Sequence, residues 1–147
     1  MHSRARSAMS KISVSSSNAP KVGFSAGTVP PLSQAIVHGD LIFCSGSGPL
    51  DPATREIVSD DIAAQVKQTL TNLLAVVEAA GGTKDSILKC NCYLRDAAQF
   101  PEFNQAYREF FADCESFPAR TTVNAPPHRA GVNVEVECIA AVVTEQS

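Results

Sequence analysis

Arg120 and a pair of glutamates, Glu135 and Glu137, are the residues of this chain whose types and spacing best suit acid–base chemistry on a small anionic substrate. Arg120 lies in 117–123, a stretch typical of a β-strand, and its planar guanidinium matches the shape of a carboxylate. In 134–139 the glutamates alternate with apolar residues, so both face away from the core of a pleated strand. A glutamate there can take or deliver a proton. The pattern indicates a site for a small anionic substrate on neighbouring elements of one sheet.

Each of these residues also has an ordinary structural interpretation. Arg120 could form an ion pair at the surface or at an interface, and the glutamates could be the solvated face of an edge strand. We interpret His38 and His128 as loop histidines rather than catalytic bases.

Length and composition favour one globular domain. The chain has 147 residues, 44% of them hydrophobic and only 18% charged, and the low charge suggests that other copies of the chain cover part of its surface. The formal net charge of -3 gives no electrostatic footprint for nucleic acid, and no apolar run has the length of a membrane span. We expect neither a nucleic-acid partner nor a membrane partner.

The five cysteines are interpreted as buried thiols in a reducing compartment. Four of them lie in apolar, strand-like stretches, and Cys114 is expected on a helix. Cys90 and Cys92 would share one face of a strand, but the sequence has no partner pair with zinc-type spacing. We therefore expect no metal site.

Residues 1–20 are expected to form a tail separate from a single domain over 21–147. The tail is rich in arginine and serine, and no acidic residue precedes Asp40. We interpret it as a short disordered tail with an internal start at Met9, and its composition, which is that of a mitochondrial transit peptide, gives the alternative. We expect a cytoplasmic location, with a mitochondrial one as the alternative. Residues 11–15 alternate and could form a first edge strand.

Hydrophobic periodicity predicts a mixed α+β fold. One helix begins at the capping residues 59–61 and ends before Gly81-Gly82, and a second spans 100–114. Strands are expected at 35–37, 41–46, 87–93, 117–123 and 132–143. We expect both helices to pack on one face of the sheet, so that the opposite face, with Glu135, meets water or other subunits.

Several pieces of the sequence, in this order, resemble the Rid (YjgF) family of reactive-intermediate deaminases. They extend from about Pro20 to Val143 and include Ser33-Gln34-Ala35, Ser45-Gly46, Phe103-Asn104-Gln105-Ala106-Tyr107, Phe117-Pro118-Ala119-Arg120-Thr121-Thr122-Val123 and Val134-Glu135-Val136-Glu137-Cys138-Ile139-Ala140. The resemblance implies a chorismate-mutase-like homotrimer, with the sheets forming an inner barrel and a cleft between each pair of subunits. It also implies hydrolysis of 2-imino and 2-enamino acids to 2-keto acids and ammonia, without cofactor or metal.

The resemblance assigns roles to individual residues. Arg120 would anchor the substrate carboxylate, and Glu135 would hold the attacking water and receive its proton. Thr122 and the backbone around Ser45 and Gly46 would supply hydrogen bonds, and Asn104 matches an asparagine near the subunit interface. Leu32 stands where the family commonly has a tyrosine that covers the substrate, which favours a larger or less polar substrate side chain.

Two alternatives to this hydrolase remain. The protein could be a non-catalytic trimer that binds a small carboxylate or a partner protein, which the loss of the tyrosine at Leu32 favours. It could also be an enzyme of a specialised pathway acting on a bulkier enamine. Some relatives are described as ribonucleases, but this acidic chain has no basic stripe with interleaved aromatic residues.

Overall fold

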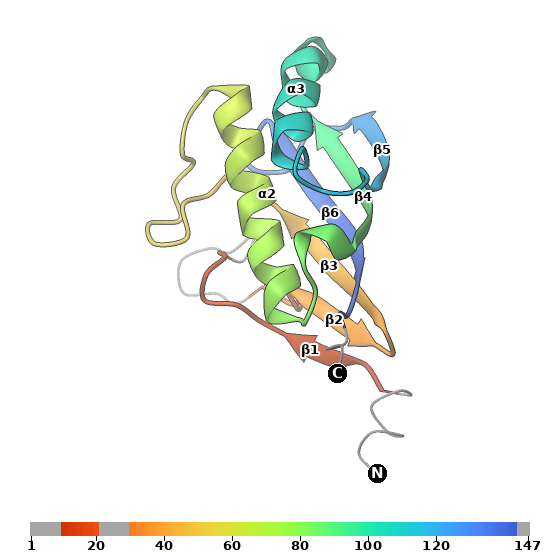
Figure 1. Cartoon of the computed structure of the whole chain (residues 1–147). Helices are drawn as coiled ribbons and strands as arrows, with labels where there is room; N and C mark the ends of the chain where they lie inside the picture. Colours follow the sequence, from red (N-terminus) through yellow and green to blue (C-terminus); the bar gives the residue numbers. More distant parts are fainter. Residues whose placement is uncertain (1–9, 21–29, 144–147) are drawn as a thin grey trace.

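Alternating apolar and polar residues build one six-stranded mixed sheet (Figure 1). The computed structural model describes residues 10–20 and 30–143. The sheet has the order β1-β2-β3-β6-β4-β5, and only β4 and β5 run parallel. The strands are β1 (Ile12–Val14), β2 (Ala35–His38), β3 (Leu41–Ser47), β4 (Ile87–Leu94), β5 (Ala119–Asn124) and β6 (Val134–Ala141).

Two helices lie on the same face of this sheet, as the sequence predicts (Figure 1). The long helix α2 (Ile62–Ala79) begins where the Asp61 carboxylate accepts a hydrogen bond from the backbone N–H of Ala64 at 2.9 Å. It ends before Gly81, whose φ of 100° suits glycine. Helix α3 (Phe100–Phe110) connects β4 to the parallel strand β5 and packs beside α2. No helix of the described residues is long and apolar enough to cross a bilayer.

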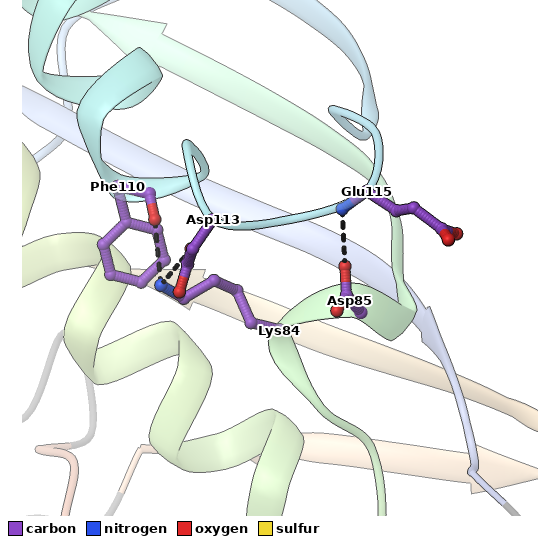
Figure 2. A network of polar contacts seen from close by, with 5 residues as sticks. All are labelled: Lys84, Asp85, Phe110, Asp113 and Glu115. Carbon is purple, nitrogen blue, oxygen red and sulfur yellow. Dashed lines mark hydrogen bonds and ion pairs between the residues drawn. The ribbon is translucent and has the colours of Figure 1, made fainter.

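Helix α3 ends at Phe110, four residues earlier than predicted, because a neighbouring segment holds its end. The short 3-10 turn η1 (Lys84–Ser86) carries a lysine whose Nζ donates to the backbone oxygen of Phe110 at 2.9 Å and to Asp113 at 3.1 Å (Figure 2). The next residue, Asp85, accepts from the backbone N–H of Glu115 at 3.1 Å. Cys114 therefore lies in a half-buried turn and not on the helix.

The two faces of β6 have different environments, as its alternation predicts. Its even-numbered residues, among them Val136 and Cys138, are buried under the helices, whereas Glu135 and Glu137 are half-buried on the open face. The buried face includes the free thiols of Cys44, Cys90, Cys92 and Cys138, together with side chains of both helices.

The open face is partly apolar. Phe43 pairs with Ile139, and Leu41 pairs with Ala141, so their side chains lie on the same face as Glu137. Phe43 is 41% exposed and Leu41 is 39% exposed. Helices α2 and α3 lie on the other face of the sheet (Figure 1), and an open face with such apolar side chains suits contact with another copy of the chain.

Part of the predicted tail belongs to the sheet. Strand β1 pairs with β2, which confirms the edge strand expected at 11–15. Gln34 binds the segment that follows β1. Its side-chain oxygen accepts a hydrogen bond from the backbone N–H of Ser16 at 2.6 Å, and its side-chain amide donates to the backbone oxygen of Ala19 at 3.0 Å. The folded chain thus begins before the expected boundary at residue 20. The rest of the transit-like segment, residues 1–9, lies outside the described residues.

Replacing the buried Gln65 by leucine is expected to destabilise the protein by about 2–4 kcal/mol. Its amide donates to the backbone oxygens of Ser59 and Gly131 at 2.9 Å each, and its oxygen accepts from the N–H of Asn133 at 2.8 Å. Leucine would leave all three backbone groups without this partner. Denaturant unfolding measures the change, with Gln105→Leu on the exposed side of α3 as the control. Equal unfolding midpoints for the two variants would contradict the expectation.

Candidate active site

Arg120 lies at the edge of the sheet, on the face that the helices cover. Its partner across the ladder is the buried Cys90 of β4, and its side chain extends toward α3. The guanidinium carbon is 4.7 Å from the ring centre of Tyr107, 5.5 Å from that of Phe103 and 5.7 Å from that of Phe100. These aromatic contacts favour a fixed position for the charge.

A cavity of about 360 Å³ opens beside this arginine, between α3 and the start of β5. It is lined by Asn104, Tyr107, Arg108, Phe117, Pro118 and Arg120. None of these residues is acidic, so the cavity is positively charged and suited to an anionic ligand.

Thr122 follows on the same face as Arg120, opposite Cys92 of β4. Its buried hydroxyl lies beside the Cys92 thiol, and that of Tyr107 lies beside the Cys90 thiol, so a weakly hydrogen-bonding sulfur is the neighbour of each. Burial raises the pKa of Cys90 to about 11 and that of Cys92 to about 12, so both thiols stay protonated at neutral pH. Protonated thiols are poor nucleophiles, so neither cysteine is suited to nucleophilic catalysis.

Glu135 lies on the open face of the sheet, opposite Tyr93. Its side chain packs against Gly46, where an added Cβ would lie 2.9 Å from Glu135 Cδ and 3.1 Å from Cγ and would overlap Oε2. The neighbouring Glu137 is engaged, because it accepts a hydrogen bond from the side chain of Asn91 at 3.1 Å. Of the two glutamates, Glu135 is therefore the better placed to bind a water or a ligand.

A loop that carries a histidine borders this glutamate. Glu135 and His128 line one narrow pocket. Arg95 fixes the loop by donating to the backbone oxygens of Pro127 at 2.6 Å and Arg129 at 2.9 Å. Burial raises the pKa of the Glu135 carboxyl, His128 opposes that rise, and Glu137 adds to it.

Ser45 and Gly46 lie in an irregular part of β3, where the register with β6 shifts between Cys44 and Ser47. The Ser45 hydroxyl donates to the backbone oxygen of Ser33 at 2.6 Å, so it holds the segment that precedes β2. The adjacent Leu32 is 40% exposed. Leu32, Ser45, Gly46 and Glu135 thus belong to a group around β3 and β6.

The predicted site residues therefore form two groups in a single chain. Arg120 and Asn104 line the α3–β5 cavity and Thr122 follows Arg120 on the same face, whereas Glu135 and Gly46 lie on the open face. The prediction that the arginine and the glutamate lie on neighbouring strands is wrong, because β4 lies between β5 and β6. The register of each strand with β4 also puts the two side chains on opposite faces of the sheet.

No role was assigned from the sequence to three residues that line these sites, Arg108 and Phe117 in the cavity and His128 beside Glu135. Only the spacing of four residues between Asn104 and Arg108 could have indicated Arg108. No group of three or more metal-ligating side chains occurs within residues 10–20 and 30–143.

The raised pKa of Glu135 predicts a pH effect on any reaction that needs its ionised form. The acidic limb of the activity profile should lie above the ordinary glutamate pKa of about 4.3, and it should move to higher pH in His128→Asn. The Glu135 carboxyl binds its proton more tightly in the folded chain than in the unfolded chain. Its contribution to the stability of the fold therefore falls as the pH rises from the ordinary glutamate pKa through the raised pKa of the folded chain. Glu135→Gln should therefore raise the thermal unfolding temperature at neutral pH. A limb that stays in place in His128→Asn would contradict the expectation.

Comparison with known proteins agrees with this fold. Residues 25–142 match the family described as Endoribonuclease L-PSP. The chain is 41% identical over 123 residues to a RutC family protein of Pyrococcus horikoshii, which covers 84% of this chain and 91% of the relative. It is 34% identical over 114 residues to a 2-iminobutanoate/2-iminopropanoate deaminase of Dermatophagoides farinae, which covers 78% of this chain and 88% of that protein.

A solved structure supports the same assignment. YyfA of Yersinia pestis, a protein of the Rid family, superposes with a TM-score of 0.81 at 34% identity, over 90% of this chain and all of that chain. The mixed sheet with two helices on one face is thus an L-PSP/YjgF fold. The chain belongs to the YjgF/Rid family.

Proposed function

We propose that the protein hydrolyses 2-imino and 2-enamino acids to 2-keto acids and ammonia, in clefts formed between the subunits of a homotrimer. The observation that carries this proposal is the acid-free cavity with Arg120 at its wall, which suits a substrate carboxylate. The relative from Dermatophagoides farinae, named as a deaminase of this kind, supports the choice of reaction.

The reaction needs few protein groups. A protonated imine carbon is already electrophilic, so the protein has to orient the substrate, place a water and move protons. Arg120 holds the carboxylate by a bidentate, charge-assisted pair. Glu135 accepts a proton from the water as its oxygen bonds to the imine carbon, and then returns a proton to the nitrogen. As the C–N bond breaks, the added oxygen forms the keto C=O bond and its proton passes to Glu135 and then to the departing ammonia, so that one water is consumed for each keto acid formed.

The positions of the two groups favour a site shared between chains. Arg120 and Glu135 lie on opposite faces of one sheet and cannot both reach one small substrate within a chain. The half-exposed side chains of Leu41 and Phe43, on the same face of the sheet as Glu135, suit contact with a second copy. A neighbouring subunit would bring its Arg120 cavity toward this face, and the mass of the assembly in native buffer tests the trimer.

The test is to add the protein to a dehydratase that generates 2-iminobutanoate and to measure the release of ammonia and keto acid. The expected result is release faster than in buffer, with Arg120→Ala much slower than the unaltered protein. A rate equal to that of buffer, together with no difference in Arg120→Ala, would reject the proposal.

Leu32 supports a second candidate function, a trimer that binds a small carboxylate without converting it. Leu32 is 40% exposed and offers no hydroxyl to a substrate. Stabilisation of the fold by keto acids, without any ammonia release from an imine, would decide for this function.

A further inference from the structure

The cavity beside Arg120 contains a second guanidinium group, that of Arg108. Arg108 lies one helical turn after Asn104 on α3, so the two side chains occupy the same side of the helix and both line the cavity. The guanidinium carbon of Arg108 is 5.9 Å from the ring centre of Phe117, which lines the same cavity. This contact favours a position of the second charge at the cavity wall.

No acidic side chain of the described residues forms an ion pair with either arginine. The residues three and four positions before Arg108 on α3 are Gln105 and Asn104, neither of which is charged. Within the described residues the only ion pair joins Lys84 to Asp113, on a different part of the surface. Two guanidinium groups that line one cavity without a counter-ion repel each other, and a ligand with two negative groups would relieve that repulsion.

We propose that the cavity selects imino acids with a second carboxylate on the side chain, of the kind derived from aspartate or glutamate. This inference rests on the proposed function. Arg120 binds the carboxylate next to the imine carbon, and Arg108 binds the distal one. A cavity of about 360 Å³ has room for a four- or five-carbon diacid, and the ring of Phe117 provides an apolar wall for the carbons between the charges.

Hydrolysis of a diacid imine has the same stoichiometry as the reaction proposed above. Water adds to the imine carbon, the C–N bond breaks, and a dicarboxylic 2-keto acid and ammonia are released. The distal carboxylate takes no part in the chemistry. Arg108 is therefore a specificity-determining residue, and its removal should change the choice between substrates more than the reaction itself.

In the experiment, flavin-dependent amino-acid oxidases generate two imines in situ, in the same mixture as the protein. Catalase removes the hydrogen peroxide that the oxidases release. One arm oxidises D-glutamate to 2-iminoglutarate, and the other oxidises D-2-aminobutanoate to 2-iminobutanoate. The readout is the protein-dependent rate of keto-acid release in each arm. We expect the unaltered protein to prefer the diacid, Arg108→Leu to lower the diacid-to-monoacid ratio of rates by about tenfold or more, and Arg108→Lys to keep part of the preference. Gln105→Leu, on the exposed side of the same helix, is the control and should keep the ratio.

The outcomes separate this inference from the proposed function. Turnover of 2-iminobutanoate without a preference for the diacid, or a ratio that stays the same in Arg108→Leu, would overturn the inference and leave the hydrolase intact. If neither imine is converted, the proposed function fails, and the cavity is tested by binding. Stronger thermal stabilisation by 2-ketoglutarate than by 2-ketobutanoate, lost in Arg108→Leu, would support the diacid site. Equal stabilisation by both would overturn it.

Discussion

Arg120→Lys is expected to lower kcat/KM for imine hydrolysis about 100-fold, which corresponds to roughly 2.7 kcal/mol of transition-state stabilisation. Lysine keeps the positive charge but loses the fork that binds both carboxylate oxygens. It also loses the flat contact with the rings of Tyr107, Phe103 and Phe100, at 4.7–5.7 Å, which fixes the guanidinium. The measurement is steady-state release of keto acid, together with the unfolding midpoint.

Lys67→Ala is the control, because it changes a cationic side chain outside the cavity. Lys67 is an exposed residue of α2 that lines a separate hollow of the surface, so its removal should leave keto-acid release unchanged. An Arg120→Lys protein that is folded and as active as the parent would exclude the bidentate role of the arginine.

Gly46→Ala is expected to reduce activity at least tenfold, with only a small change in stability. A methyl group at this position would overlap the Glu135 carboxylate, so that side chain has to move away from its place on the open face. The displaced atoms belong to the end of a flexible side chain, which can turn aside at little conformational cost. The loss should therefore appear mainly in kcat rather than in folding.

Gly48→Ala is the control for this substitution. A Cβ on Gly48 meets no atom within 4 Å, so alanine fits there without displacing a neighbour. Both variants change a glycine of the same segment, and only one of them affects Glu135. Equal activities in Gly46→Ala and Gly48→Ala would show that the position of the glutamate does not matter for the reaction.

Local patterns were sufficient to predict the elements of the fold. The alternation in 134–139 correctly placed Glu135 and Glu137 on the open face, because the side-chain direction in a strand follows a period of two. The capping carboxylate of Asp61 marked the start of α2. The end of α3 could not be predicted from local sequence, because it depends on Lys84, which lies 26 residues before Phe110 (Figure 2).

The arrangement of the site depends on pairing between distant strands. Arg120 was expected at the margin of the sheet, and the edge strand β5 places it there. The face of the sheet to which its side chain points depends on the pairing of Arg120 with Cys90 of β4. A shift of one residue would have turned it to the side of Glu135. A linear pattern contains no information on that register. The same limit applies to Arg108, which joins the cavity only because β5 begins beside α3.

The central claim is that each active site combines Arg120 of one subunit with Glu135 of another. Mixing two inactive variants, Arg120→Ala and Glu135→Gln, and allowing their subunits to exchange tests it most directly. Every chain in the mixture lacks one of the two groups. A site between chains is nevertheless intact when one chain supplies the arginine and its neighbour supplies the glutamate, so an equal mixture should regain about a quarter of the unaltered activity. Activity that stays at the level of the separate variants, although native mass measurements show mixed assemblies, would contradict the claim.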